Sequence, residues 1–247
     1  MSVPWALSRA SPRVADGLEE EGPRTFPVRH ALSHVIRLRD VWILGVALLG
    51  VGGGVQGLLG YLPLYLRDIG WEAGRADASL AAFHAISLLA VLPLAMLSDR
   101  GGSRRKLLIA AALMTALGIG LLSIADAAGI WIAILMAGAV RDGFMAVFMT
   151  AVTEVEGVGA EYAGTALGLA MTLSRIGALI APPLGNALAA YGDRTPFLLW
   201  TGMAVLGLGA LGRLGRGGAG RPKRAERGPV ASSEPRMRGA SDPERFA

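Results

Sequence analysis

Long runs of apolar residues with few charges dominate the middle of this chain. Six runs can be separated by their polar boundaries: Val41–Leu66, Ala78–Ser98, Leu107–Ala125, Ile130–Val152, Ala163–Ala190 and Pro196–Gly212. A helix needs about 20 predominantly apolar residues to cross a bilayer, and most of these runs are that long. The pattern therefore predicts an all-α membrane protein, with a six-transmembrane-helix bundle over residues 41–213.

The segments on either side of these runs are polar. Residues 1–40 contain several prolines and an acidic cluster, and we expect a cytoplasmic, loop-like segment. From about His30 to Asp40 the pattern predicts a short amphipathic helix at the membrane surface. Residues 214–247 are rich in Gly, Pro and Arg, which predicts a disordered basic cytoplasmic tail. A solvated terminus and a weak site for anionic lipid are both open interpretations of that tail.

Composition and charge placement support a membrane protein. Only 17% of the residues are charged, against about 25% in soluble domains. The net charge of +5 could indicate a nucleic-acid partner, but 19 of the 24 Lys and Arg residues lie on the side of the predicted bundle that holds both termini. The positive-inside rule places that side in the cytoplasm. We therefore expect a multi-pass protein of the cell inner (plasma) membrane, with both termini cytoplasmic and no nucleic-acid partner.

The turn between the second and third runs carries the most informative motif, AMLSDRGGSRRK from Ala95 to Lys106. It resembles the loop signature of the major facilitator superfamily, although Ala95 stands where the family prefers Gly and Ser103 where it prefers Arg. An acid that ends one helix can pair with bases that begin the next and so hold one conformation. The resemblance thus implies a conformational-gating loop made of Asp99, Arg100, Gly102, Arg104 and Arg105. A plain positively charged turn is the alternative.

A second motif lies in the fifth run. Gly168, Gly177, Pro182 and Gly185 follow the spacing of a helix signature of the same superfamily, with Ala181 in place of one Gly. Small residues let helices approach closely, and a proline bends a helix, so we expect a helix-packing motif. A generic packing face is the alternative for this segment alone.

Taken together, the stretch from Trp42 to Trp200 resembles the C-terminal six-helix half of such a transporter, with some similarity to the cyanate permease-like branch. The resemblance implies secondary transport of a small polar solute by alternating access, with the lipid bilayer and the solute as partners. Transporters of this kind bind their solute between two halves, so an N-terminal six-helix half is expected from elsewhere or from a homodimer. The alternative is a truncated or non-transporting membrane subunit that needs a partner half.

No enzyme is predicted. The sequence has no His-Glu-x-x-His, no Gly-x-Ser-x-Gly and no phosphate-binding Gly-rich loop, and it contains no Cys. We expect no cofactor and no metal site. His30 and His34 are four residues apart, but without a third ligand nearby they are interpreted as ordinary residues of the amphipathic helix.

Polar residues inside the apolar runs are the candidates for solute binding, because a charge in the bilayer is costly and usually faces the protein interior. The candidates are Gln56, His84, Arg141 and Asp142. Arg141 could bind an organic anion and Asp142 could take a coupling proton. Adjacent residues do not share a helix face, so these two are not expected simply to neutralise each other. Structural pairing, or packing in the case of His84, is the alternative for each, and Arg175 is expected to hold helices together.

Overall fold

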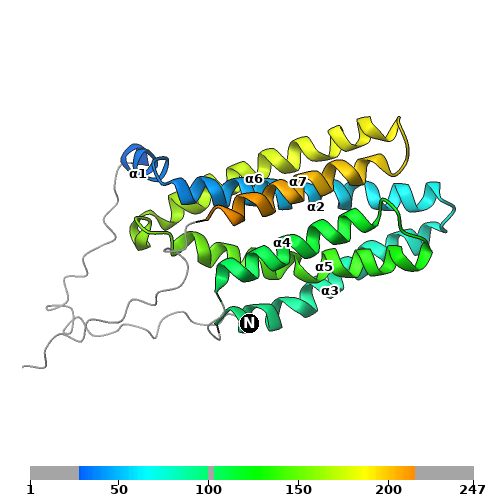
Figure 1. Cartoon of the computed structure of the whole chain (residues 1–247), viewed down its shortest axis with the longest axis horizontal. Helices are drawn as coiled ribbons and strands as arrows, with labels where there is room; N and C mark the ends of the chain where they lie inside the picture. The colour runs from blue at the N-terminus through cyan, green and yellow to red at the C-terminus, as the bar shows by residue number, and fades with distance from the viewer. Residues whose placement is uncertain (1–27, 100–102, 215–247) are drawn as a thin grey trace, which may run out of the picture.

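The computed structural model describes residues 28–99 and 103–214 (Figure 1). Within them the chain is all-helical, as the sequence predicted. The helices are α1 (Val28–Val35), α2 (Arg39–Asp68), α3 (Ala73–Asp99), α4 (Arg104–Leu121), α5 (Ala127–Thr153), α6 (Gly159–Ala189) and α7 (Thr195–Gly212). The predicted basic tail beyond Leu214 and two gating-loop residues, Arg100 and Gly102, lie outside the described residues.

Six long helices, α2 to α7, correspond to the six apolar runs, but five of them are long and apolar enough to span a membrane by length and composition. The sixth is α4, with 18 residues. It falls short because Arg104, Arg105 and Lys106 occupy its first turn. The predicted surface helix is also shorter than expected: α1 ends at Val35, and Arg39 already begins α2.

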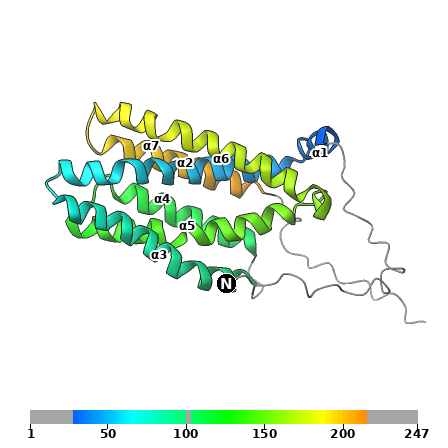
Figure 2. The same ribbon diagram turned by 180° about the vertical axis from the view of Figure 1, so that it is seen from behind.

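Two groups of three consecutive helices, α2–α4 and α5–α7, interleave to form the bundle (Figure 2). The first helix of each group packs mainly on the second and third helices of the other group: α2 lies on α6 and α7, and α5 lies on α3 and α4. α4 and α7 also contact each other, whereas contacts inside each group are sparse. Neither group can therefore bury its apolar surface without the other, and the bundle forms one packed unit.

Glycines of α2 let its backbone touch the two helices that flank it. A methyl group added to Gly50 would come within 2.8 Å of the Gly207 backbone nitrogen on α7. One added to Gly53 would come within 3.1 Å of the Gly177 backbone on α6. The first contact is closer than real Cβ atoms approach, and the second is tighter than most of their contacts, so the Gly-rich stretch of α2 is the central element of the packing.

Trp200 joins three helices near the end of the bundle opposite α1. Its side chain is fully buried, and its indole Nε1 donates a hydrogen bond to the Ala181 carbonyl oxygen at 2.8 Å. A methyl group on Gly57 of α2 or on Gly185 of α6 would overlap the indole ring. The two glycines thus form the slot that admits the indole of α7.

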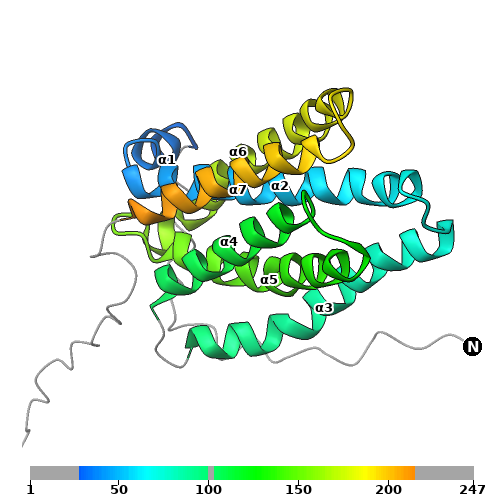
Figure 3. The same cartoon turned by 45° about the vertical axis from the view of Figure 1, so that its right-hand side comes forward.

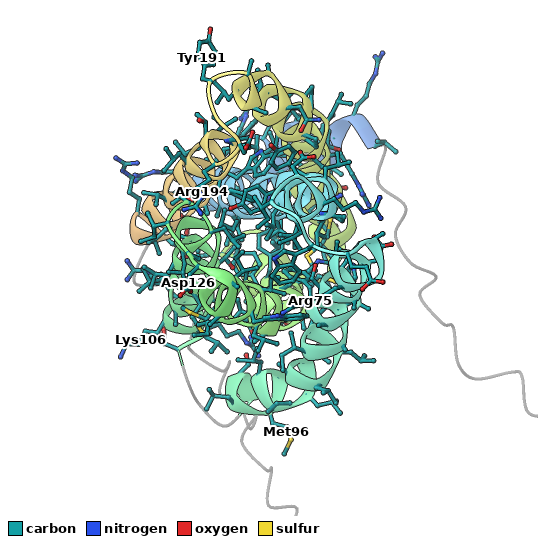
Figure 4. The ribbon with its side chains drawn as sticks, turned by 90° about the vertical axis from the view of Figure 1, so that its right-hand side faces the viewer. Arg75, Met96, Lys106, Asp126, Tyr191 and Arg194 are labelled. Atoms are coloured by element: carbon teal, nitrogen blue, oxygen red, sulfur yellow. The ribbon has the colours of Figure 1, made fainter. Side chains whose placement is uncertain are left out.

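The outer faces of α3 and α6 remain largely uncovered. On α3, Leu88, Leu89 and Leu92 are each 69–73% exposed. Figure 4 shows Met96 of α3 and Tyr191, just beyond α6, pointing away from the bundle on opposite sides. Apolar surface of this extent is stable in lipid or against another membrane protein, but not in water.

An aspartate cap begins α5. The carboxylate of Asp126 accepts a hydrogen bond from the Gly129 backbone N–H at 2.8 Å. We expect Asp126→Ala to lower the free energy of unfolding by about 1 kcal/mol, because one N–H at the helix start loses its partner. Asp126→Asn keeps the acceptor and should stay close to the wild type. Reversible unfolding of the two variants in mixed micelles measures the difference, and equal losses would exclude a capping role.

Candidate solute-binding cavity

A cavity of about 200 Å³, partly open to the surface, lies between α2, α5 and α6, with one residue from α4. Gln56, Arg141 and Arg175 all come from the middle parts of their helices, so the cavity sits near the midplane of the bundle. Its polar lining residues are Gln56, Thr115, Arg141, Asp142, Ser174 and Arg175. Phe144, Met145 and Met171 are among the residues that form its apolar wall.

Three of the four candidate solute-binding residues line this cavity together: Gln56 on α2, and Arg141 and Asp142 on α5. His84 does not line it. That residue lies on α3 with an exposed side chain, and its ring stands edge-on to the ring of Phe83 at 5.6 Å. The sequence shows how deep His84 lies in its apolar run, but it does not show which side of α3 faces the cavity.

Arg141 and Asp142 form an ion pair, contrary to the expectation that neighbours on a helix would not neutralise each other. The Nη1 of Arg141 lies 2.8 Å from the Oδ1 of Asp142. The two Cβ atoms point about 100° apart, but the arginine side chain is long enough to bend back across that angle. The backbone N–H of Asp142 also contacts the buried Ser87 hydroxyl on α3 at 3.1 Å, which ties this turn of α5 to α3.

Arg175 is the lining residue that sequence reasoning assigned to a structural role. Its side chain is exposed, and among the described residues it makes no hydrogen bond or ion pair. Within the part of the chain that the structure describes, Arg175 therefore makes no polar link between α6 and another helix. The charge of Arg175 could have identified it as a cavity residue from the sequence. An unpaired cation at mid-depth of a membrane helix is tolerated only where it faces water, a ligand or another protein.

The electrostatics of the cavity favour a small anion. Two guanidinium groups and one carboxylate face the same space, which leaves one positive charge. Because Asp142 already engages Arg141, the unpaired fork of Arg175 is the group most available to a ligand. A guanidinium matches a carboxylate with two parallel hydrogen bonds, and Ser174 and Gln56 add neutral donors. The arrangement can therefore hold a carboxylate against an apolar wall.

Two residues of the predicted gating loop, Arg104 and Arg105, bond to other helix ends of the bundle. Arg104 forms an ion pair with Glu154 at the end of α5. Arg105 donates hydrogen bonds to the carbonyl oxygens of Leu211 at 3.3 Å and Gly212 at 2.7 Å. A cation at these carbonyls also complements the negative end of the α7 dipole. Asp99 is the last residue of α3, which places it at the same end of the bundle.

The residues of the helix-packing motif have different surroundings along α6. A methyl group on Gly177 would come within 2.5 Å of the Leu49 carbonyl oxygen of α2, and Gly185 borders Trp200. Pro182 lies inside the helix. A methyl group on Gly168 would meet no atom within 4 Å. The close approach is thus concentrated in the half of α6 that is far from α1.

Similarity to known proteins shows the class to which this chain belongs. The family model of the Major Facilitator Superfamily matches residues 1–182 and, in a second alignment, residues 80–241. The chain belongs to this superfamily of membrane transporters. The similarity to the cyanate permease-like branch stays a prediction.

Two individual proteins are similar to the chain. A gentisate transporter of Corynebacterium glutamicum is 29% identical over 157 residues, which cover 63% of this chain and 35% of that transporter. A crystal structure of the E. coli fucose:proton symporter superposes with a TM-score of 0.64 at 17% identity, covering 76% of this chain and 46% of the symporter. At this identity, the similarity to the symporter concerns the fold alone. The chain thus spans about a third to a half of the length of these proteins.

Proposed function

We propose that this chain supplies one half of a secondary transporter for a small organic anion. The observation that carries the proposal is Arg175, an unpaired guanidinium at mid-depth that faces the same cavity as Arg141. An uncompensated charge in the membrane costs several kcal/mol, and a bound carboxylate would remove that cost. The gentisate transporter offers independent support, since gentisate is an organic anion with an aromatic ring. The apolar wall of Phe144, Met145 and Met171 suits such a ring.

Proton coupling is the second part of the proposal. Asp142 and an incoming carboxylate compete for Arg141, whose Nη1 lies 2.8 Å from the Asp142 carboxylate. Protonation of Asp142 would release Arg141 for the solute, so proton and anion binding would favour each other. The same groups could then carry both through the alternating-access cycle.

The remaining wall of the cavity would come from a second six-helix half. That half could belong to the same longer polypeptide, to another gene product or to a second copy of this chain. The uncovered apolar faces of α3 and α6 offer surface for it. We also propose that the end of the bundle bearing α1 is cytoplasmic, because Arg104, Arg105 and Lys106 lie at this end, where α4 begins.

Calorimetric titration of the purified chain in lipid nanodiscs tests anion binding directly. We expect saturable binding of gentisate and benzoate, and none of benzylamine, which has a similar ring and the opposite charge. Binding of benzylamine, or no binding of either acid, would contradict the proposal. Binding without any uptake of radiolabelled gentisate into proteoliposomes would instead favour a subunit that needs its partner half.

The Asp142→Asn variant tests coupling. Removing the carboxylate frees Arg141, so we expect carboxylate affinity to rise about tenfold, the effect of one charged hydrogen bond. We also expect the pH dependence of anion binding to flatten, because the competing acid is gone. Titrations at several pH values compare this variant with Asp77→Asn, which removes a carboxylate outside the cavity, at the end of the bundle opposite α1. Unchanged affinity and pH dependence in Asp142→Asn would exclude the coupling role.

A further inference from the structure

Part of the apolar face of α1 is left uncovered by the bundle. Ala31 and Val35 are buried, whereas Val28, Leu32 and Ile36 are 78%, 40% and 45% exposed. The exposed three are four residues apart, so they form one stripe along the helix and the turn that follows it. Isolated apolar residues on a surface need no explanation, but a stripe that continues a buried face indicates a second apolar environment.

The position of this stripe is fixed by three contacts. The Nε2 of His34 lies 2.8 Å from the Gly157 carbonyl oxygen in the α5–α6 connection. The centroid of the His34 ring lies 4.5 Å from that of the Tyr162 ring in α6, and the two ring planes are tilted by 30°. Trp42 of α2 donates from Nε1 to the Ile36 carbonyl oxygen at 2.8 Å. Figure 3 shows α1 at the end of the bundle where α7 finishes. The helix is thus held beside the first turns of α2 and α6.

Basic side chains border the stripe. Arg29, Arg37 and Arg39 are exposed, and none forms an ion pair or hydrogen bond with another described residue. The α1 sequence VRHALSHV contains no acid. Trp42, next to the stripe, is 39% exposed. An apolar stripe, flanking arginines and a half-exposed tryptophan are the features of a helix that lies in the headgroup region of an anionic bilayer.

We propose that α1 is a binding site for anionic phospholipid headgroups. The stripe of Val28, Leu32 and Ile36 enters the acyl boundary, while Arg29 and Arg37 contact lipid phosphates. Charge complementarity selects anionic lipid as the occupant, and the α1–α2 connection places the stripe beside the bilayer. The inference concerns a surface away from the solute cavity and does not depend on the solute.

Spin labelling gives a test of where the stripe lies. The chain has no Cys, so Leu32→Cys can carry a single nitroxide in the full-length protein. In nanodiscs of phosphatidylcholine with phosphatidylglycerol we expect the label to be more accessible to oxygen than to a water-soluble nickel reagent. The opposite preference is expected for a label at Ser33→Cys on the polar face. Water-like accessibility at residue 32, or protection from both reagents by a covering protein segment, would overturn the proposal.

Neutralising the arginines tests the preference for anionic lipid. Native mass spectrometry of the delipidated full chain, titrated with phosphatidylglycerol or phosphatidylcholine, measures the selectivity. Each arginine near an anionic surface is worth about fivefold in binding, so Arg29→Gln with Arg37→Gln should lower the selectivity by at least about tenfold. The matched control, Arg67→Gln with Arg75→Gln, removes two charges at the opposite end of the bundle and should leave it unchanged. Equal losses in both pairs, or none in either, would contradict a site on α1.

Discussion

Replacing Arg175 by glutamine is expected to lower the affinity for gentisate by about a hundredfold. The guanidinium faces the cavity without a partner, so a bound carboxylate would depend on it for charge and for two parallel hydrogen bonds. Losing a charged hydrogen-bonding partner costs about 2–5 kcal/mol where the pair is buried, as it would be once a second half covers the cavity, and a hundredfold loss lies inside that range. Calorimetric titration of wild type and variant in nanodiscs measures the ratio.

Two further variants make the Arg175 result specific. Arg175→Lys keeps the charge but not the planar fork, so it should fall between wild type and Arg175→Gln. Arg67→Gln removes an arginine at the far end of the bundle, which pairs with Asp77 and does not line the cavity. Gentisate affinity should be unaffected by it. If Arg175→Gln binds as tightly as the wild type, Arg175 serves another purpose, such as pairing with an acid of the second half.

The second large effect is expected from a single methyl group on α2. Gly50→Ala would place its Cβ against the Met203 carbonyl oxygen and the Gly207 nitrogen of α7. Both are backbone atoms of a packed helix, so α2 and α7 must separate. Overpacking of this kind typically costs about 1–3 kcal/mol. We expect a corresponding fall in the free energy of unfolding in mixed micelles, followed by tryptophan fluorescence.

Gly60→Ala on the same helix is the matched control. A methyl group at Gly60 would meet no atom within 4 Å. Alanine is also the better helix former, so this change should be neutral or stabilise the protein by up to about 1 kcal/mol. The two substitutions share their chemistry and helix and differ only in the neighbouring backbone. Equal effects would mean that α2 and α7 do not approach each other as the structure shows.

Most of the helical architecture was predictable because membrane spans obey a local rule. Each run of apolar residues must satisfy its own backbone hydrogen bonds, and a helix of about 20 residues does so without reference to any other segment. The positions of α2 to α7 therefore follow from hydropathy alone. The helix ends do not: α3 begins at Ala73 rather than at the predicted Ala78, and α4 begins at Arg104, where Glu154 and the end of α7 provide partners for charge in the first turn.

The cavity was only partly predictable, because its residues come from four helices that the fold brings together. The sequence by itself determined an all-helical membrane protein and identified the mid-depth polar residues Gln56, Arg141 and Asp142. The depth of a residue in the membrane depends on its position along one helix, and this position can be read from the sequence. Which way a side chain faces depends on how the helices pack. The tertiary structure alone placed His84 outside the cavity, paired Arg141 with Asp142 and turned Arg175 toward the same space.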